Sequence, residues 1–166
     1  MSFDLNIWFW LVLLFFILFF LHLIESVFER YPYQKKFQIM SAAEKHFYTV
    51  LKRTVGSQFE IYPQLSIGRL VSVTRGIRRS YRYWNKISQK SVDFVLVDPQ
   101  TTQPVLVIEL DDVSHSLPTR IQRDGFVVHV FKDVGIPIMH QNVFSSYDEL
   151  SLRQQIDELL GVGQGA

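Results

Sequence analysis

The chain has 166 residues and a formal net charge of +1, and it contains no cysteine. That length accommodates one compact domain of about 120 residues together with a membrane anchor. Without cysteine, disulfides, thiolate zinc sites and cysteine nucleophiles are excluded, so no disulfide partner is expected. A net charge this close to zero says nothing about binding partners, whereas the distribution of charge along the chain does.

The N-terminal segment, residues 1–30, is expected to be a membrane anchor. Its residues 5–24 read LNIWFWLVLLFFILFFLHLI and carry no formal charge apart from a protonatable His22. This apolar length is sufficient to span a bilayer as a helix, and Trp8 and Trp10 suit the membrane interface. A cleaved signal peptide is the alternative, but no Lys or Arg precedes the apolar run and no small-x-small cleavage motif follows it.

Basic residues lie only on the C-terminal side of this segment. Asp4 precedes the apolar run, whereas Arg30, Lys35 and Lys36 follow it. Since Lys and Arg near a span set its orientation, the sequence predicts a single-pass protein of the bacterial inner membrane with a cytoplasmic soluble domain. Residues 31–40 form a basic juxtamembrane linker, and each basic residue near the surface contributes about 1 kcal/mol of attraction to anionic lipid.

The soluble domain is expected to occupy residues 41–160 and to begin with a helix and a strand. Ser41, followed by Glu44 three residues later, is a capping box. It opens an amphipathic helix that runs to about Val55, with Gly56 as its stop. Residues 59–65, FEIYPQL, have the composition of a strand with a proline near its end.

Residues 68–90 are rich in arginine and lysine and contain no acidic residue. Basic side chains recur every four residues from position 78, which on a helix makes a basic stripe opposite an apolar face. Such a helix with interleaved aromatic residues suits a phosphate backbone. The alternatives are attraction to the anionic membrane and a solvated helix face. The candidate nucleic-acid-binding residues are Arg75, Arg78, Arg79, Arg82, Lys86 and Lys90.

Two apolar runs, residues 92–97 and 105–110, flank a turn that contains Asp98, Pro99 and Pro104. Each run has strand length and is rich in β-branched residues, so the pair predicts a β-hairpin. A loop centred on Thr101 would place residues opposite each other when their numbers sum to 202. The expected pairs are Val97 with Val105, Val95 with Val107, and Asp93 with Glu109.

Three carboxylates are expected to converge at the open end of this hairpin. Because side chains alternate between the faces of a strand, Glu109 and Asp111 share a face with Asp93. Like charges placed opposite each other destabilise a sheet, and a carboxylate in so apolar a run requires compensation. A divalent cation would provide that compensation, so the pattern predicts a metal site.

The remaining segments predict a helix, a strand and a second helix. Residues 118–134 form the first helix, in which Gly125 suggests close packing on the sheet. Residues 135–140 form a short last strand. Ser146 with Glu149 is expected to be the capping box of a helix that ends near Leu160, and its apolar positions are Leu150, Leu152, Ile156, Leu159 and Leu160. Residues 161–166 form a flexible glycine-rich tail.

The string VDFVL…VIELDD.SH…R..RD resembles the PD-(D/E)XK, or restriction-endonuclease-like, nuclease superfamily. It is similar to an uncharacterised bacterial domain-of-unknown-function branch of that superfamily and to the very-short-patch-repair endonucleases. The resemblance covers roughly residues 41–140. Asp93 matches the aspartate of the motif, and Glu109-Leu110-Asp111 matches the (D/E)-x-K segment, with Asp111 where the superfamily usually has lysine.

The resemblance implies roles for further residues. His115 would replace the missing lysine as general acid or base, as histidines near the metal do in the mismatch-repair branch. Glu44 matches the acidic residue that related nucleases place near the metal, although a plain helix cap is its alternative role. Arg120 and Arg123 would contact the substrate if the superfamily packing holds, and surface ion pairs are their alternative.

We therefore expect an α/β protein with a restriction-endonuclease-like αβββαβ core behind one N-terminal transmembrane helix. The expected activity is Mg²⁺- or Mn²⁺-dependent hydrolysis of nucleic acid, DNA rather than RNA, at the cytoplasmic face of the membrane. The alternative is a catalytically degenerate module that binds nucleic acid or a protein partner at the membrane. The expected catalytic residues are Asp93, Glu109, Asp111 and His115, and the expected metal ligands are Asp93, Glu109, Asp111 and Glu44.

Overall fold

The computed structural model describes residues 3–27, 31–111 and 118–162, and the side chains of residues 6–24, 31–111 and 125–162 within them. The chain divides into two compact units, residues 1–37 and residues 38–166. The four terminal residues of the predicted glycine-rich tail and the predicted catalytic residue His115 lie outside the described residues.

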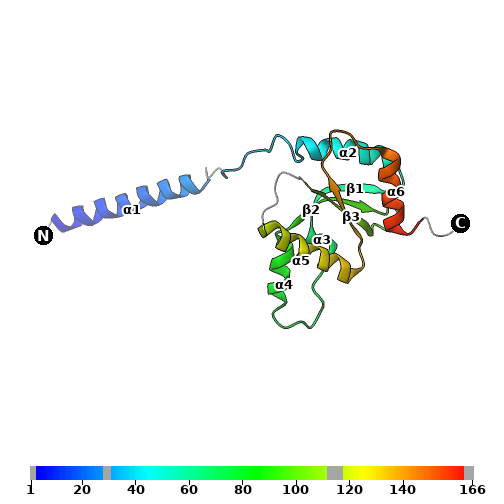
Figure 1. Cartoon of the computed structure of the whole chain (residues 1–166). Coiled ribbons are helices and arrows are strands. Elements are labelled where there is room, and N and C mark those ends of the chain that lie inside the picture. Colours follow the sequence, from blue (N-terminus) through cyan, green and yellow to red (C-terminus); the bar gives the residue numbers. More distant parts are fainter. Residues whose placement is uncertain (1–2, 28–30, 112–117, 163–166) are drawn as a thin grey trace. The chain divides into compact units, whose positions relative to one another are not determined.

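The first unit contains one long apolar helix, α1 (Phe3–Val27) (Figure 1). Its residues Asn6–Ile24 are long and apolar enough to cross a membrane, which agrees with the predicted span of residues 5–24. Its large apolar side chains are between 39% and 68% exposed, from Leu13 to Trp8. Side chains this apolar around a whole helix require an apolar surrounding, either protein or lipid.

The second unit is built on one mixed four-stranded sheet in the order β1-β2-β3-β4. The strands are β1 (Glu60–Ser66), β2 (Ser91–Val97), β3 (Pro104–Asp111) and β4 (Ile138–Asn142). The first three form an antiparallel meander, and β4 joins β3 in parallel. The last strand begins three residues later than predicted, because Gly135, with φ of 76°, first turns the chain out of the preceding helix.

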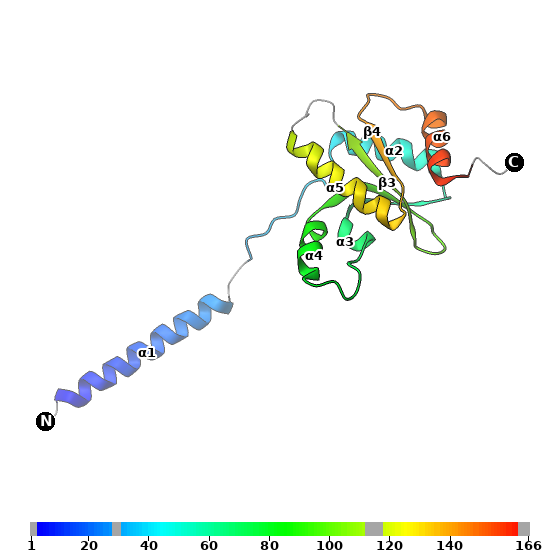
Figure 2. The same cartoon turned by 60° about the horizontal axis from the view of Figure 1, so that its bottom comes forward.

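Helices cover both faces of the sheet, which gives three layers (Figure 2). One face packs against α2 (Ala42–Val55) and α6 (Glu149–Leu160), and the core between them includes Phe47, Phe94 and Ile156. The other face packs against α3 (Ile67–Leu70), α4 (Ser80–Ser88) and α5 (Pro118–Val134) around Val95 and Phe131. With α2 before the meander and α5 before β4, the sequence order of these main elements is αβββαβ, followed by α6.

The caps of α2 and α6 were predicted with different success. Ser41 and Glu44 form the expected reciprocal capping box on α2. The predicted box at Ser146 is wrong, since Asp148 caps α6 through the amides of Leu150 and Ser151. Of the predicted apolar positions, Leu152 and Ile156 are buried, whereas Leu150 is 82% and Leu159 is 41% exposed.

The hairpin of β2 and β3 has most of the predicted register. Val95 lies opposite Val107 as expected, but Val97 pairs with Pro104 instead of Val105, because the register shifts after Leu96. The turn explains the shift: the Asp98 carboxylate accepts hydrogen bonds from the amides of Gln100 and Thr101, both at 2.8 Å. This side-chain turn is tighter than the symmetrical loop that the sequence suggested.

The predicted basic helix is shorter than expected. Helix α4 spans only Ser80–Ser88, so Arg78 precedes it and Lys90 follows it. Gly76 and Arg79 have φ angles of 82° and 60°. Because a residue in the left-handed conformation cannot belong to a right-handed helix, α4 cannot begin before Ser80. The basic residues at every fourth position therefore do not form one continuous helical stripe.

The prediction that Gly125 packs closely on the sheet is also wrong. A Cβ at Gly125 in α5 would meet no atom within 4 Å.

We therefore expect Gly125→Ala to stabilise the protein by about 1 kcal/mol, since alanine is the better helix former. Gly135→Ala is the matched comparison, because it also adds a methyl group in open space but at a φ of 76°. It should destabilise by about 1–2 kcal/mol. Thermal unfolding of both variants measures the contrast, and equal shifts would contradict it.

Candidate functional site

Asp93 of β2 is the centre of the polar cluster at the end of the hairpin. It is half-buried, and its Oδ2 accepts a hydrogen bond of 2.8 Å from the backbone amide of Leu110 in β3. Its Oδ1 lies 3.4 Å from Nε2 of Gln64. The register of the hairpin, continued one step from Phe94 and Ile108, places Asp93 opposite Glu109. The apolar strands therefore hold these two carboxyl groups next to each other.

Burial and crowding raise the pKa of Asp93 above its ordinary value of 3.8. Desolvation is the largest cause, and the negative charge of Glu44 adds to it. Hydrogen bonds from the Leu110 amide, with Glu109 and from Gln64 act in the opposite direction. The charged form of Asp93 is therefore costly in this structure, and a bound cation would relieve that cost.

Glu44 reaches this cluster from the first turn of α2. One of its carboxylate oxygens accepts the Ser41 amide as part of the capping box. The other, Oε1, accepts a hydrogen bond of 2.7 Å from Gln64. The same side chain thus caps α2 and is hydrogen-bonded to Gln64 of the acidic cluster, while its predicted role near a metal stays a prediction.

Gln64 connects Glu44 to Asp93, and it was not among the residues selected from the sequence. Its φ is 51°, a left-handed conformation that is uncommon for residues other than glycine and costs about 1–3 kcal/mol. Gln64 lies in β1 directly after Pro63, and the sequence analysis predicted this position only as part of a strand. The signal that identifies it is the backbone angle together with its two carboxylate neighbours.

Asp111, two residues beyond Glu109 on β3, lies next to His140 of β4. Its Oδ2 is 3.1 Å from Nδ1 of His140, and both side chains are partly exposed. The parallel register pairs Glu109 with His140 and Asp111 with Asn142. His140 was predicted only as part of a strand, and it joins the site through this pairing.

The predicted metal site stays a prediction. In residues 6–24, 31–111 and 125–162, no group of three or more His, Asp or Glu side chains has a metal-binding arrangement. The acidic side chains of the cluster offer carboxylate oxygens, which are the ligands that Mg²⁺ and Mn²⁺ prefer. Asp93, Glu109 and Glu44 fit such an ion by chemistry, while Asp111 contacts His140.

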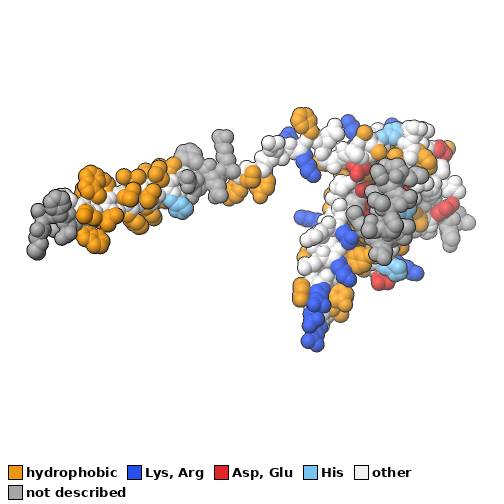
Figure 3. Space-filling view, turned by 60° about the vertical axis from the view of Figure 1, so that its left-hand side comes forward, with side chains coloured by type: hydrophobic (Ala, Val, Ile, Leu, Met, Phe, Trp, Pro, Cys, Tyr) orange, Lys and Arg blue, Asp and Glu red, His pale blue; other side chains and the backbone are white. Residues whose placement is uncertain are grey.

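The predicted nucleic-acid-binding residues divide into three groups. Arg75, Arg78, Arg79 and Arg82 are exposed at α4 and the loop before it. Lys and Arg side chains gather on this projecting part of the domain (Figure 3). The Nζ atoms of Lys86 and Lys90 each lie 5.9 Å from the ring centre of Phe126. These two lysines therefore make cation–π contacts within the protein in addition to carrying positive charge. Arg120 and Arg123 belong to α5, but their side chains lie outside the described part of the chain.

The structure thus defines a mixed α/β protein with an acidic cluster at the end of its central hairpin and an arginine-rich projection. Residues 35–159 match the family model described as "Protein of unknown function (DUF2726)". This match covers most of the chain, so the protein belongs to that family. No curated protein and no solved structure matches the chain.

Proposed function

We propose that the protein is a membrane-anchored, Mg²⁺- or Mn²⁺-dependent nuclease that hydrolyses phosphodiester bonds at the cytoplasmic face. The observation that carries the proposal is the pairing of Asp93 with Glu109 at the end of an apolar antiparallel hairpin, with Glu44 joined to it through Gln64. The order αβββαβ and the parallel last strand support a restriction-endonuclease-like core.

Each residue of the cluster has a role in this proposal. Asp93 and Glu109 hold the cation, while Gln64 and the Leu110 amide fix the orientation of Asp93. A bound Mg²⁺ supplies a nucleophile from water and stabilises the leaving oxygen. His140 accepts a proton at Nε2, and Asp111 holds its Nδ1–H, as carboxylates orient histidines in other sites. His115 remains a second candidate for this proton transfer.

A catalytically degenerate binding module is the second candidate function. The observation that favours it is the position of Asp111, which stands where the related nucleases carry lysine and is in contact with His140. A lysine there would add positive charge beside the reacting phosphate, whereas Asp111 adds none. The two functions share the arginine-rich projection and differ only in hydrolysis.

The proposed nuclease activity is tested by incubating the full chain in detergent with labelled DNA and Mg²⁺ or Mn²⁺. Glu109→Gln keeps the size of the side chain and removes its charge, so it should lose cleavage while binding of the substrate remains. Metal-dependent cleavage that persists equally in Glu109→Gln would place the active site elsewhere. If the wild-type chain binds DNA without cutting it, the degenerate module is the better description.

Cytoplasmic orientation of the second unit is the part of the proposal that the charge asymmetry supports. Arg30, Lys35 and Lys36 follow α1, and only Asp4 precedes its apolar run. We expect a reporter fused after Ala166 to behave as cytoplasmic, because positive residues are retained on that side of the membrane. A paired fusion of a reporter active only in the periplasm should be silent. Activity of the periplasmic reporter would reverse the orientation and remove chromosomal DNA as a substrate.

A further inference from the structure

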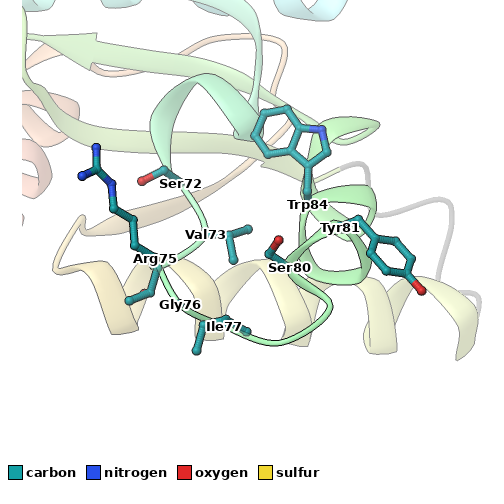
Figure 4. A pocket seen from close by; sticks show the side chains of 9 residues that line it. Ser72, Val73, Arg75, Gly76, Ile77, Ser80, Tyr81 and Trp84 are labelled. Atoms are coloured by element: carbon teal, nitrogen blue, oxygen red, sulfur yellow. The ribbon is translucent and has the colours of Figure 1, made fainter.

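The projection formed by the loop before α4 and the start of that helix contains a hollow of about 460 Å³. This volume is typical of small-molecule pockets, which range from about 300 to 1,000 Å³. The residues that line it are Ser72, Val73, Thr74, Arg75, Gly76, Ile77, Ser80, Tyr81 and Trp84 (Figure 4). The hollow lies in the part of the chain without acidic residues and is not formed by the Asp93 cluster.

Two aromatic residues of α4, Tyr81 and Trp84, are among those that line this hollow, and both are exposed. Trp84 is 45% exposed and Tyr81 is 58% exposed, and Figure 4 shows their rings leaving α4 in different directions. The indole of Trp84 rests on the backbone of α3, since a Cβ added to Gly68 would lie only 3.0 Å from that ring. The Trp84 ring is therefore held in place on one side and open on the other.

We propose that this hollow binds an unpaired nucleobase, so that the substrate is single-stranded nucleic acid or a duplex with unpaired bases. The inference rests on the proposed function and specifies its substrate. A flat base stacks on Trp84, the next base along the strand stacks on Tyr81, and arginines neutralise the phosphates between them. Aromatic platforms beside basic side chains are how proteins hold single strands without sequence preference.

The polar part of the lining favours a nucleobase over an acyl chain. The lining includes the hydroxyl groups of Ser72, Thr74 and Ser80, which can hydrogen-bond the polar edge of a base but have no partner in hydrocarbon. The arginines at positions 75, 78, 79 and 82 are exposed and provide the positive charge that a chain of phosphates requires.

The first experiment compares two tyrosines of the same helix. Tyr81 lines the hollow, whereas Tyr83 is equally exposed, at 55%, and does not line it. The full chain in phosphatidylcholine nanodiscs is titrated with a fluorescent deoxythymidine oligonucleotide and with a duplex of the same length. We expect tighter binding of the single strand and a five- to tenfold rise in its Kd, roughly, for Tyr81→Ala. Tyr83→Ala should bind like the wild type. Equal losses in the two variants, or equal affinity for strand and duplex, would overturn the inference.

The second experiment uses Trp84 as its own reporter. Trp8, Trp10 and Trp84 are the three tryptophans of the chain, so the double substitution Trp8→Phe and Trp10→Phe leaves Trp84 as the sole indole. The oligonucleotide should quench its emission, while nanodiscs of phosphatidylglycerol with brominated acyl chains should not. Quenching by the brominated lipid would show that the projection inserts into the membrane and would overturn the inference.

The outcome is separable from that of the nuclease proposal. If Asp93-dependent cleavage is found on duplex DNA with no preference for single strands, the nuclease proposal stands and the base-binding hollow fails. If the single strand binds through Tyr81 and Trp84 but is never cut, the hollow stands and the nuclease proposal fails.

Discussion

Asp93→Asn is expected to reduce metal-dependent cleavage by at least about 100-fold, and to raise the thermal stability of the metal-free protein. If the proposed function holds, the loss of activity follows from removing a charged metal ligand, since even partners outside the ligand shell change metal affinity by about 10–100-fold. The gain in stability follows from the local electrostatics. Asp93 is partly desolvated and close to the negative charge of Glu44, and both effects raise its pKa.

The pH dependence of this gain has a definite sign. A raised pKa means that folding favours the protonated carboxyl, so the contribution of Asp93 to stability is fully present below its ordinary pKa of 3.8. That contribution is lost as the pH rises through the folded-state pKa. Asparagine does not titrate, and its Oδ1 can still accept the Leu110 amide. The stability advantage of Asp93→Asn should therefore be largest at neutral pH and shrink as the pH falls toward 3.8.

Asp98 provides a control with the opposite sign. Hydrogen bonds from the amides of Thr101 and Gln100 lower the pKa of this exposed turn carboxyl. Its contribution is present above the ordinary pKa of 3.8 and is lost as the pH falls through the folded-state value. Asp98→Asn should therefore lower stability at neutral pH, with cleavage unchanged because Asp98 lies in the hairpin turn, outside the cluster.

Thermal unfolding with and without Mn²⁺ completes this comparison. Ligand binding stabilises the folded state by RT ln(1 + [L]/Kd), or about 2.7 kcal/mol at 100 times Kd. The wild type and Asp98→Asn should show this shift, and Asp93→Asn should lose most of it. A wild-type protein with no Mn²⁺-dependent shift would remove the metal from the proposed function.

The hairpin and the flanking helices were predictable because their signals are local. The two apolar runs of the hairpin, the turn at Asp98 and the Ser41 capping box each depend on residues a few positions apart, and the structure contains all three. The failures at Val97, Arg78 and Ser146 also have local causes. A side-chain turn, two left-handed residues and a competing aspartate cap each moved the end of an element by a few residues.

The site was less predictable because its contacts join distant parts of the chain. Asp93 and Glu109 share a hairpin, so their proximity followed from its register. Gln64 comes from a different strand, and His140 reaches Asp111 only through the parallel pairing of β3 with β4. Parallel neighbours are connected through a helix, and no pattern of residues near His140 specifies which strand it will join.

The arginine-rich projection is expected to determine the salt dependence of nucleic-acid binding. Arg78 and Arg82 are exposed on it, and neither lines the hollow beside Trp84. Combining Arg78→Ala with Arg82→Ala should weaken binding of every sequence. It should also flatten the dependence of log K on log salt by about 0.7 per lost phosphate contact on single strands and about 0.9 on duplex DNA.

A charge-matched variant separates contact with phosphate from the general effect of net charge. Lys52 and Lys132 are exposed on α2 and α5. Changing both to alanine removes two positive charges, as the arginine variant does, but from helices outside the projection. Titrations of labelled strand and duplex at several salt concentrations should give this variant the wild-type slope. The slope should fall only in the arginine variant, because counterions are released where side chains meet phosphates. An unchanged slope in the arginine variant, or the same fall in both variants, would mean that the projection does not contact the phosphate backbone. Attraction to the anionic membrane would then account better for its arginines.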